Sequence, residues 1–182
     1  MGGDGFYTSA VANEGVVYAS VGGRTGGGSI AVRSGGKRDV TKSHVNWNGR
    51  TQASFGTPLV HDGLLFILTR GGVMNVVDAS SGKELKKVRL ESTPESKPKN
   101  GNSGGGRMGS ADYGSPVLAG KFIYYTKGNG ETFVLTPDKE CEQVAVNKLT
   151  DEAEIFSGTP AITKGQISVS YTHLTLPTNR EV

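Results

Sequence analysis

The sequence predicts an all-β fold, a partial β-propeller of four-stranded antiparallel blades, and three observations lead to this prediction. A Gly-[Thr/Ser]-Pro sequence followed by two short apolar segments recurs three times in the 182 residues. Further apolar segments follow these after Gly-containing turns, so a unit of four strands returns about every 45 to 60 residues. No useful stretch shows the 3.6-residue apolar period of a helix. A β-sandwich would not explain why the same unit returns in register, so we favour the propeller.

Each unit is expected to begin with a hairpin. The three closest copies start at Gly56, Gly114 and Gly158, and a fourth copy without proline starts at Ser9. A proline is tolerated at the first position of a strand, and a tight turn needs a residue with positive φ, which glycine adopts without strain. The prolines and turn glycines that we single out as structural repeat residues are Pro58, Gly63, Pro116, Gly120, Pro160 and Gly165.

Two more strands should complete each blade. Residues 30–32, 73–77 and 132–135 are predicted third strands, and residues 85–90 and 141–146 are predicted fourth strands. We therefore expect about three blades plus part of a fourth, with approximate bounds 1–47, 48–90, 114–149 and 150–167.

Two segments are expected to lie outside the blades. Residues 91–113 are polar and have no apolar residue that could anchor a core before Met108, which predicts an inserted flexible loop. Residues 168–182 lack the Gly turn and third strand that the pattern requires, and we expect them to be a non-native tail. The propeller section would then span residues 1–167, and we expect it to be the C-terminal half of a larger ring.

The chain resembles the pyrroloquinoline-quinone-like β-propeller repeat family, whose non-enzymatic members include the BamB-like outer-membrane assembly lipoproteins. The resemblance rests on the Gly-[Thr/Ser]-Pro strand starts and on residues 77–85 (VDASSGKEL). In that turn Asp78 can accept backbone N–H bonds and Gly82 can supply a left-handed residue. The family usually has a Trp after the turn, packed between neighbouring sheets, where this chain has Lys86; the first unit keeps a Trp as Trp47. The resemblance implies a ring of about eight blades in an extracytoplasmic protein of the periplasm or cell envelope.

Composition and charge exclude several classes of protein. The 28 glycines follow no collagen period, and no apolar run is long enough to be a transmembrane segment. The first five residues lack the basic start and apolar stretch of a signal peptide. A net charge of +3 without a basic stripe gives no support for nucleic-acid binding.

No catalytic, cofactor-binding or metal-binding residues are assigned from the sequence. Residues 104–109 match G-x-G-x-x-G, but no helix can start after them, so nothing would hold a pyrophosphate. The three histidines have no partner at metal-ligand spacing. Cys141 lies between two glutamates, which raise a thiol pKa, so a nucleophilic role is not expected.

Three functions are therefore compared. The first is a non-enzymatic scaffold that binds a protein partner through a propeller face or the loop 91–113 and needs no cofactor. The second is a fragment of a quinoprotein dehydrogenase, which would need pyrroloquinoline quinone, Ca²⁺ and a Trp platform, with only Trp47 present. The third is weak polyanion binding by the basic residues Lys83, Lys86, Lys87, Arg89, Lys97 and Lys99. We favour the scaffold, and we expect an isolated section of a propeller to self-associate through its open sheet edges.

Overall fold

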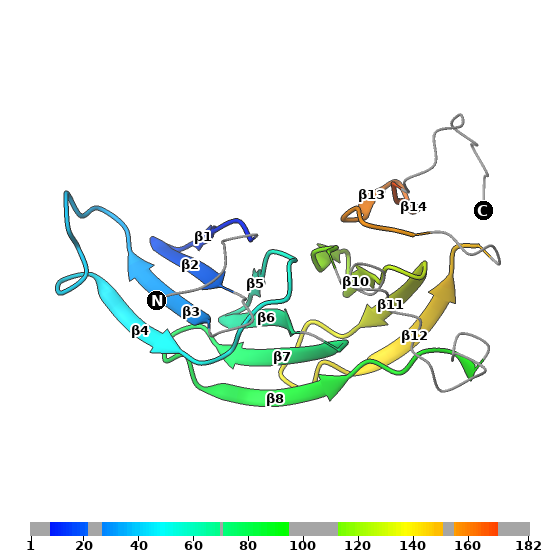
Figure 1. The fold of residues 1–182 in the computed structure, drawn as a ribbon, viewed down its shortest axis with the longest axis horizontal. Coiled ribbons are helices and arrows are strands. Elements are labelled where there is room, and N and C mark those ends of the chain that lie inside the picture. Colours follow the sequence, from blue (N-terminus) through cyan, green and yellow to red (C-terminus); the bar gives the residue numbers. More distant parts are fainter. Residues whose placement is uncertain (1–7, 22–26, 70, 95–112, 151–154, 171–182) are drawn as a thin grey trace.

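The structure, a computed structural model, describes residues 8–21, 27–69, 71–94, 113–150 and 155–170. These residues form fourteen β-strands and no α-helix, in four antiparallel sheets that follow one another along an arc (Figure 1). The prediction of an all-β partial propeller is confirmed. No helix that could cross a membrane occurs in the described part of the chain.

Three sheets have four strands each, ordered as in the sequence, and the last has two. The first blade contains β1 (Val11–Asn13), β2 (Val16–Val21), β3 (Gly28–Arg33) and β4 (Val45–Gly49). The second contains β5 (Leu59–His61), β6 (Leu64–Thr69), β7 (Val73–Asp78) and β8 (Glu84–Arg89). The third contains β9 (Val117–Ala119), β10 (Phe122–Thr126), β11 (Glu131–Leu135) and β12 (Gln143–Lys148). The fourth contains β13 (Ala161–Thr163) and β14 (Gln166–Ser168).

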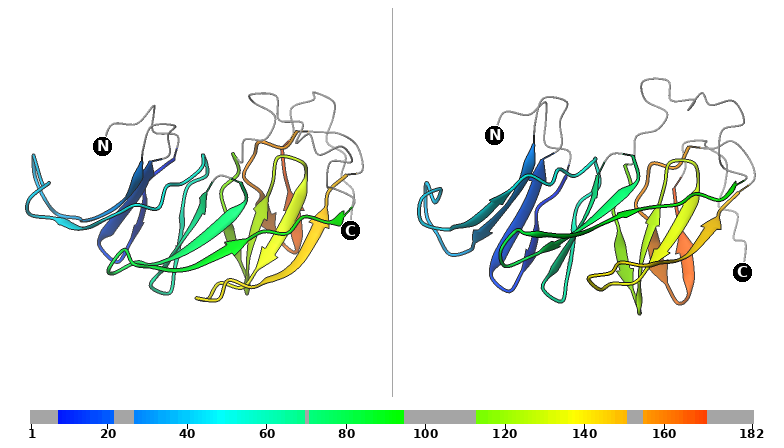
Figure 2. Two further views of the ribbon diagram at one scale, coloured as in Figure 1. Left: turned by 60° about the horizontal axis from the view of Figure 1, so that its bottom comes forward. Right: turned by 90° about the horizontal axis from the view of Figure 1, so that it is seen from below.

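The blades stand side by side with their sheet faces opposed, as Figure 2 shows. The fourth strands β4, β8 and β12 lie on the convex side of the arc, and β1, β5 and β13 lie toward the concave side (Figure 1). The middle strands β6 and β7 are almost wholly buried, whereas β8 is mostly exposed. The cores therefore lie between blades rather than within one sheet.

Alternating side chains of the second blade serve two cores. Leu65 and Ile67 face the first blade, whereas Phe66 and Leu68 face the third, as the two-residue period of a strand requires. The core between the first and second blades contains Tyr18, Ala31, Trp47, Ala53, Leu65, Ile67, Val77 and Ala79. The core between the second and third contains Phe66, Leu68, Met74, Val76, Leu90, Ile123, Tyr125, Phe133, Leu135 and Cys141.

A bulge at the same place in each complete blade defines equivalent positions. The register between third and fourth strands shifts after Ala31, Val76 and Val134. The residues paired with these three are Trp47, Lys86 and Ala145, which are therefore structural equivalents.

Some boundaries differ from those expected. β4 continues to Gly49, two residues beyond the expected end of the first blade, and β14 ends at Ser168, inside the expected tail. β12 begins at Gln143, so the expectation that a strand starts at Cys141 is wrong. Cys141 has a φ of +48°, a left-handed conformation that an extended strand excludes.

The hairpin turns also differ in one respect. Gly63 and Gly165 are the second of their two turn residues, whereas Gly120 is the first. All three nevertheless have positive φ, at +72°, +79° and +58°. Residues 95–112 of the expected loop and 171–182 of the expected tail lie outside the described residues.

Candidate functional site

A chain of hydrogen bonds joins the segments that immediately precede the first strands of all four blades. The N–H of Ser9 donates to Oγ1 of Thr57 over 3.0 Å, and the N–H of Thr57 donates to Oγ of Ser115 over 2.8 Å. The N–H of Ser115 then donates to Oγ1 of Thr159 over 3.0 Å. We call this series the hydroxyl ladder. Sequence reasoning missed its role, although the signal was present as a hydroxyl residue before every repeat proline.

A glycine precedes the hydroxyl residue in the three copies that have a proline, at Thr57, Ser115 and Thr159. A β-carbon at Gly56 would lie 2.3 Å from the carbonyl oxygen of Gly114, and one at Gly114 would lie 2.9 Å from that of Thr126. Neither distance is compatible with a side chain. The prolines that follow, Pro58, Pro116 and Pro160, are all buried. Gly56 and the hydroxyl residues of the motif thus make contacts between blades, whereas Gly114 is constrained by Thr126 of its own blade.

Trp47 packs in the interface between the first and second blades; we call such an interface between neighbouring blades a seam. Its Nε1 donates to the carbonyl oxygen of Ala79 over 2.9 Å, and its ring lies 6.2 Å from that of Tyr18 between centroids. The ring also covers Gly82, where a β-carbon would lie 2.5 Å from the indole. Gly82 has a φ of +72°, so both its backbone conformation and its lack of a side chain are needed here.

Asp78 organises the turn on which Trp47 packs. One carboxylate oxygen accepts hydrogen bonds from the hydroxyls of Ser80 and Ser81 at 2.6 and 2.7 Å and from their N–H groups at 3.1 and 2.8 Å. These bonds, the two hydroxyls first, lower the pKa of Asp78. The carboxylate is therefore a structural anchor of the turn.

The next seam uses an ion pair at the place of the Trp. Lys86 Nζ lies 2.5 Å from Oε2 of Glu140, in the corresponding turn of the third blade. This pair raises the pKa of Lys86 and lowers that of Glu140 through a side-chain hydrogen bond and charge attraction. Both side chains are about half exposed, so the pair contributes less to holding the blades than the buried indole.

Cys141 occupies the place in the third blade that Gly82 has in the second. The N–H of Thr136 donates to the carbonyl of Glu142 and the N–H of Asp78 to that of Lys83, which aligns the two turns. The thiol is fully buried, and this burial, followed by the charge of Asp138, raises the pKa of Cys141 to about 12. It is a protonated core side chain rather than a nucleophile.

A cleft of about 590 Å³, lined mostly by residues with polar side chains, lies between the first and second blades. Its walls come from the segment that follows β4 and from β6, β7 and β8 of the second blade. The lining residues are Arg50, Thr51, Gln52, Ala53, Thr69, Val73, Asn75, Gly82, Glu84 and Lys87. Of these residues, the sequence analysis singles out only Gly82, as a turn residue, and Lys87, as a candidate polyanion-binding residue.

The corresponding space between the second and third blades is held by other side chains. Oε1 of the buried Glu131 accepts from the N–H of Thr93 over 2.8 Å. Gln143 forms two hydrogen bonds of 2.9 Å with the backbone of Glu91, as donor to its carbonyl and acceptor from its N–H. The first residues of the expected flexible loop 91–113 are therefore anchored to the third blade.

The described residues do not fit a quinone and Ca²⁺ site. Trp47, the residue available as a platform, is 8% exposed and packed into a seam, so its ring cannot lie against a planar cofactor. Within the described ranges, no three His, Cys, Asp or Glu side chains gather where they could hold a metal ion. Residues 104–109 and His173 lie outside those ranges.

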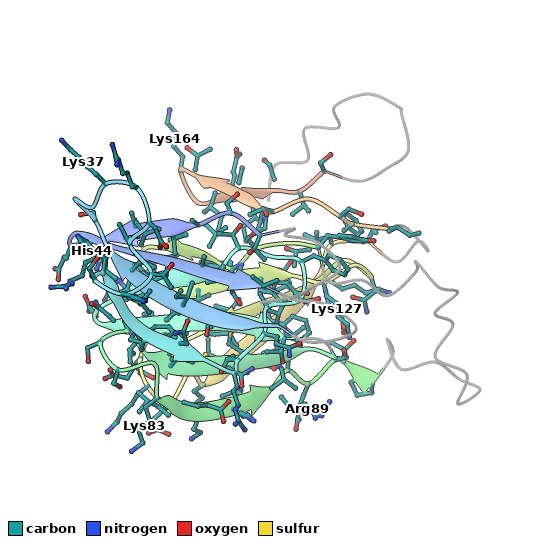
Figure 3. All side chains as sticks on the ribbon, turned by 60° about the vertical axis from the view of Figure 1, so that its left-hand side comes forward. Lys37, His44, Lys83, Arg89, Lys127 and Lys164 are labelled. Carbon is teal, nitrogen blue, oxygen red and sulfur yellow. The ribbon has the colours of Figure 1, made fainter. Side chains whose placement is uncertain are left out.

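The basic residues of β8 are partly neutralised. Lys86 pairs with Glu140, and Lys87 lies 3.1 Å from Glu84. Figure 3 shows Lys83 and Arg89 at the two ends of β8, on the outer side of the molecule. Lys97 and Lys99 lie in the part of the chain that the structure does not describe. The charges of β8 are thus divided between ion pairs and solvent, which disfavours a continuous basic face.

Comparison with known proteins shows the fold. The chain is similar to BamB from Moraxella catarrhalis, with a TM-score of 0.64 and 12% identity over 91% of this chain and 43% of that one. It is similar to a europium-containing methanol dehydrogenase, with a TM-score of 0.51 and 14% identity over 75% of this chain and 23% of that one. The computationally designed Ika8 protein gives a TM-score of 0.53 and 10% identity, over 91% and 45% of the two chains.

These similarities confirm the propeller fold that the family resemblance implies. The chain spans less than half the length of each of the three proteins. No protein-family model and no curated protein matches the sequence.

We predict that Gly82→Ala destabilises the fold more than Gly63→Ala. Both glycines have a φ of +72°, so the backbone strain of alanine, about 1 kcal/mol, is common to the two variants. Only at Gly82 does the new methyl group meet Trp47, because Gly63 has no atom within 4 Å of a β-carbon. The additional loss of unfolding free energy at Gly82, measured by urea denaturation, should be about 1–3 kcal/mol. Equal losses would show that Trp47 does not pack on this turn.

We predict that the stabilising effect of Asp78 depends on pH. The folded-state pKa of Asp78 lies below its ordinary value of 3.8, so its contribution is complete above that value and is lost as the pH falls through the lowered pKa. Asp78→Asn should therefore be less stable than the wild type above the ordinary pKa of 3.8, and the difference in unfolding free energy should shrink as the pH falls below it. Urea denaturation of both proteins across this range measures the difference. A constant difference would contradict a charged Asp78 as the anchor of the turn.

Proposed function

We propose that this chain is a section of a non-enzymatic propeller scaffold that binds a protein partner. The observation that carries the proposal is that the repeat residues have structural roles. The hydroxyl ladder, Trp47, Asp78 and Gly82 all hold blades or turns in place. A fold maintained in this way needs no reactive residue and leaves its faces and clefts for a partner.

The face that carries the connections between blades is the proposed docking face. Phe55 and Tyr113 immediately precede Gly56 and Gly114, and their rings pack with centroids 4.8 Å apart. Tyr113, the last residue of the expected loop 91–113, is 38% exposed. Aromatic side chains with one exposed side are enriched at protein interfaces. This pair and the adjoining loop would provide the contact surface.

An extracytoplasmic location is part of the same proposal. It is supported by the fold similarity to BamB from Moraxella catarrhalis and by the family resemblance of the repeat sequences. The similarity to a methanol dehydrogenase keeps a quinoprotein fragment as the alternative. The buried position of Trp47 argues against that alternative.

Site-specific photo-crosslinking tests the partner. A photoreactive phenylalanine at Tyr113 should give one discrete adduct, identified by mass spectrometry, in the cell envelope of the source organism. The same group at Val144, which is 48% exposed on the outermost strand β12, is the control and should not give that adduct. Adducts of equal yield from both positions would argue against a docking face at Tyr113.

Reconstitution tests the enzyme alternative. We expect that addition of pyrroloquinoline quinone and Ca²⁺ produces no saturable absorbance change and no alcohol-dependent dye reduction, because Trp47 is committed to a seam. A saturable change accompanied by dye reduction would overturn the scaffold proposal. Retention on heparin at low salt followed by a steep loss at higher salt would favour polyanion binding instead.

A further inference from the structure

The cleft between the first and second blades has a buried amide in its lining. Asn75, on β7, is only 2% exposed. Its Nδ2 donates to Oγ1 of Thr69 over 3.3 Å, and that hydroxyl donates to the carbonyl oxygen of Val73 over 3.0 Å. Because the Thr69 proton is used on Val73, Thr69 must act as the acceptor from Asn75, which fixes the orientation of the amide.

This orientation leaves an acceptor for a ligand. Oδ1 of Asn75 has no hydrogen-bond partner among the described residues. A polar atom on a nearly buried side chain without a partner costs free energy unless water or a ligand satisfies it. A ligand in the cleft can do so only with an N–H or O–H donor.

The cleft exists because of one replacement within the repeat. Asn75 immediately precedes the bulge residue Val76 in the second blade, as Phe133 immediately precedes Val134 in the third, so the two are structural equivalents. Phe133 is fully buried in the core between the second and third blades, where its ring packs against Tyr125 with centroids 6.1 Å apart. Asparagine is smaller than phenylalanine and polar. The equivalent position between the first and second blades is therefore less completely filled, and its side chain can form hydrogen bonds.

The charges lining the cleft are unequal. Lys87 is compensated by Glu84 at 3.1 Å. The guanidinium of Arg50 forms no ion pair with any residue that the structure describes. A guanidinium presents several donors in a plane and binds carboxylates through two parallel hydrogen bonds. The cleft thus combines an unpaired acceptor on a nearly buried side chain with an uncompensated carboxylate-binding group.

We propose that this cleft binds an extended peptide segment that carries an acidic side chain. The peptide would donate a backbone N–H to Oδ1 of Asn75, and its carboxylate would pair with Arg50. A volume of about 590 Å³ suits a short segment of this kind, since ligand sites of proteins are about 300–1,000 Å³. The inference deepens the proposed scaffold function by assigning a second contact, away from Phe55 and Tyr113, to an acidic stretch of the partner.

The test uses the full chain and a defined peptide. Acetyl-Gly-Glu-Gly-Glu-amide is titrated into the ¹⁵N-labelled protein, with acetyl-Gly-Gln-Gly-Gln-amide as the uncharged probe. We expect saturable shifts of the Asn75 side-chain amide with the glutamate peptide, and an affinity for the glutamine peptide about tenfold lower. Arg50→Gln should weaken binding of the glutamate peptide about tenfold and should not change binding of the glutamine peptide.

Two further variants separate the cleft from general charge effects. Asn75→Phe introduces the residue of the third blade and should abolish binding; Asn75→Asp, of equal size, should weaken it through repulsion and serves if the larger residue unfolds the protein. Lys164→Gln removes the same charge in the turn between β13 and β14, at the other end of the arc from β4 (Figure 1), and should leave the affinity within about twofold.

Several outcomes would overturn the inference. These are the absence of shifts at Asn75, an equal effect of Arg50→Gln and Lys164→Gln, or binding of glutarate as tight as that of the peptide, which would indicate a site for free carboxylates. Displacement of the peptide by heparin at low concentration would indicate a polyanion site. A crosslink from Tyr113 without peptide binding would support the scaffold proposal and reject the cleft as a peptide site. Peptide binding without the crosslink would support the cleft and argue against the docking face at Tyr113.

Discussion

The close approach of the segments that lead into the first strands is the constraint on which the rest of the structure depends. The carbonyl oxygen of Gly114 lies only 2.3 Å from where a β-carbon of Gly56 would be, so the blades can meet there only if residue 56 has no side chain. The adjacent hydroxyl of each repeat then reaches the N–H of the preceding blade. This contact sets the spacing between sheets, and the side chains farther out fill the gap that the spacing leaves. The outer seams can therefore vary in chemistry without loss of the architecture.

The seams do vary, and the variation follows equivalent positions. In the fourth strand, the residue opposite the bulge is the buried Trp47 in the first blade and the half-exposed Lys86 in the second. The turn opposite each has changed with it: Gly82 makes room for the ring of Trp47, whereas Cys141, with a side chain, contributes to the core instead. A packed ring in one seam and an ion pair in the next therefore connect neighbouring blades at equivalent positions.

The blades could be predicted from the sequence, whereas the contacts between blades could not. The turn glycines, the strand-initiating prolines and the alternation of apolar residues are properties of short segments, so the blades could be recognised from the sequence. The turn before β12 has one more residue than the turn before β8, which concealed the equivalence of Cys141 and Gly82. The cleft depends on which side chain of one blade covers the next: Arg50 and Asn75 are far apart in sequence, and nothing near either residue indicates that they share a cavity.

The hydroxyl ladder has a direction, because each blade donates an N–H to the blade that follows and accepts with its hydroxyl from the blade before. Donor and acceptor sides are therefore different surfaces. Two such arcs cannot join through these strands by a two-fold axis, which would bring like side against like. Any extension of the series is heterologous, head to tail, and the rotation between successive blades alone decides whether it closes into a ring or continues as an open helix.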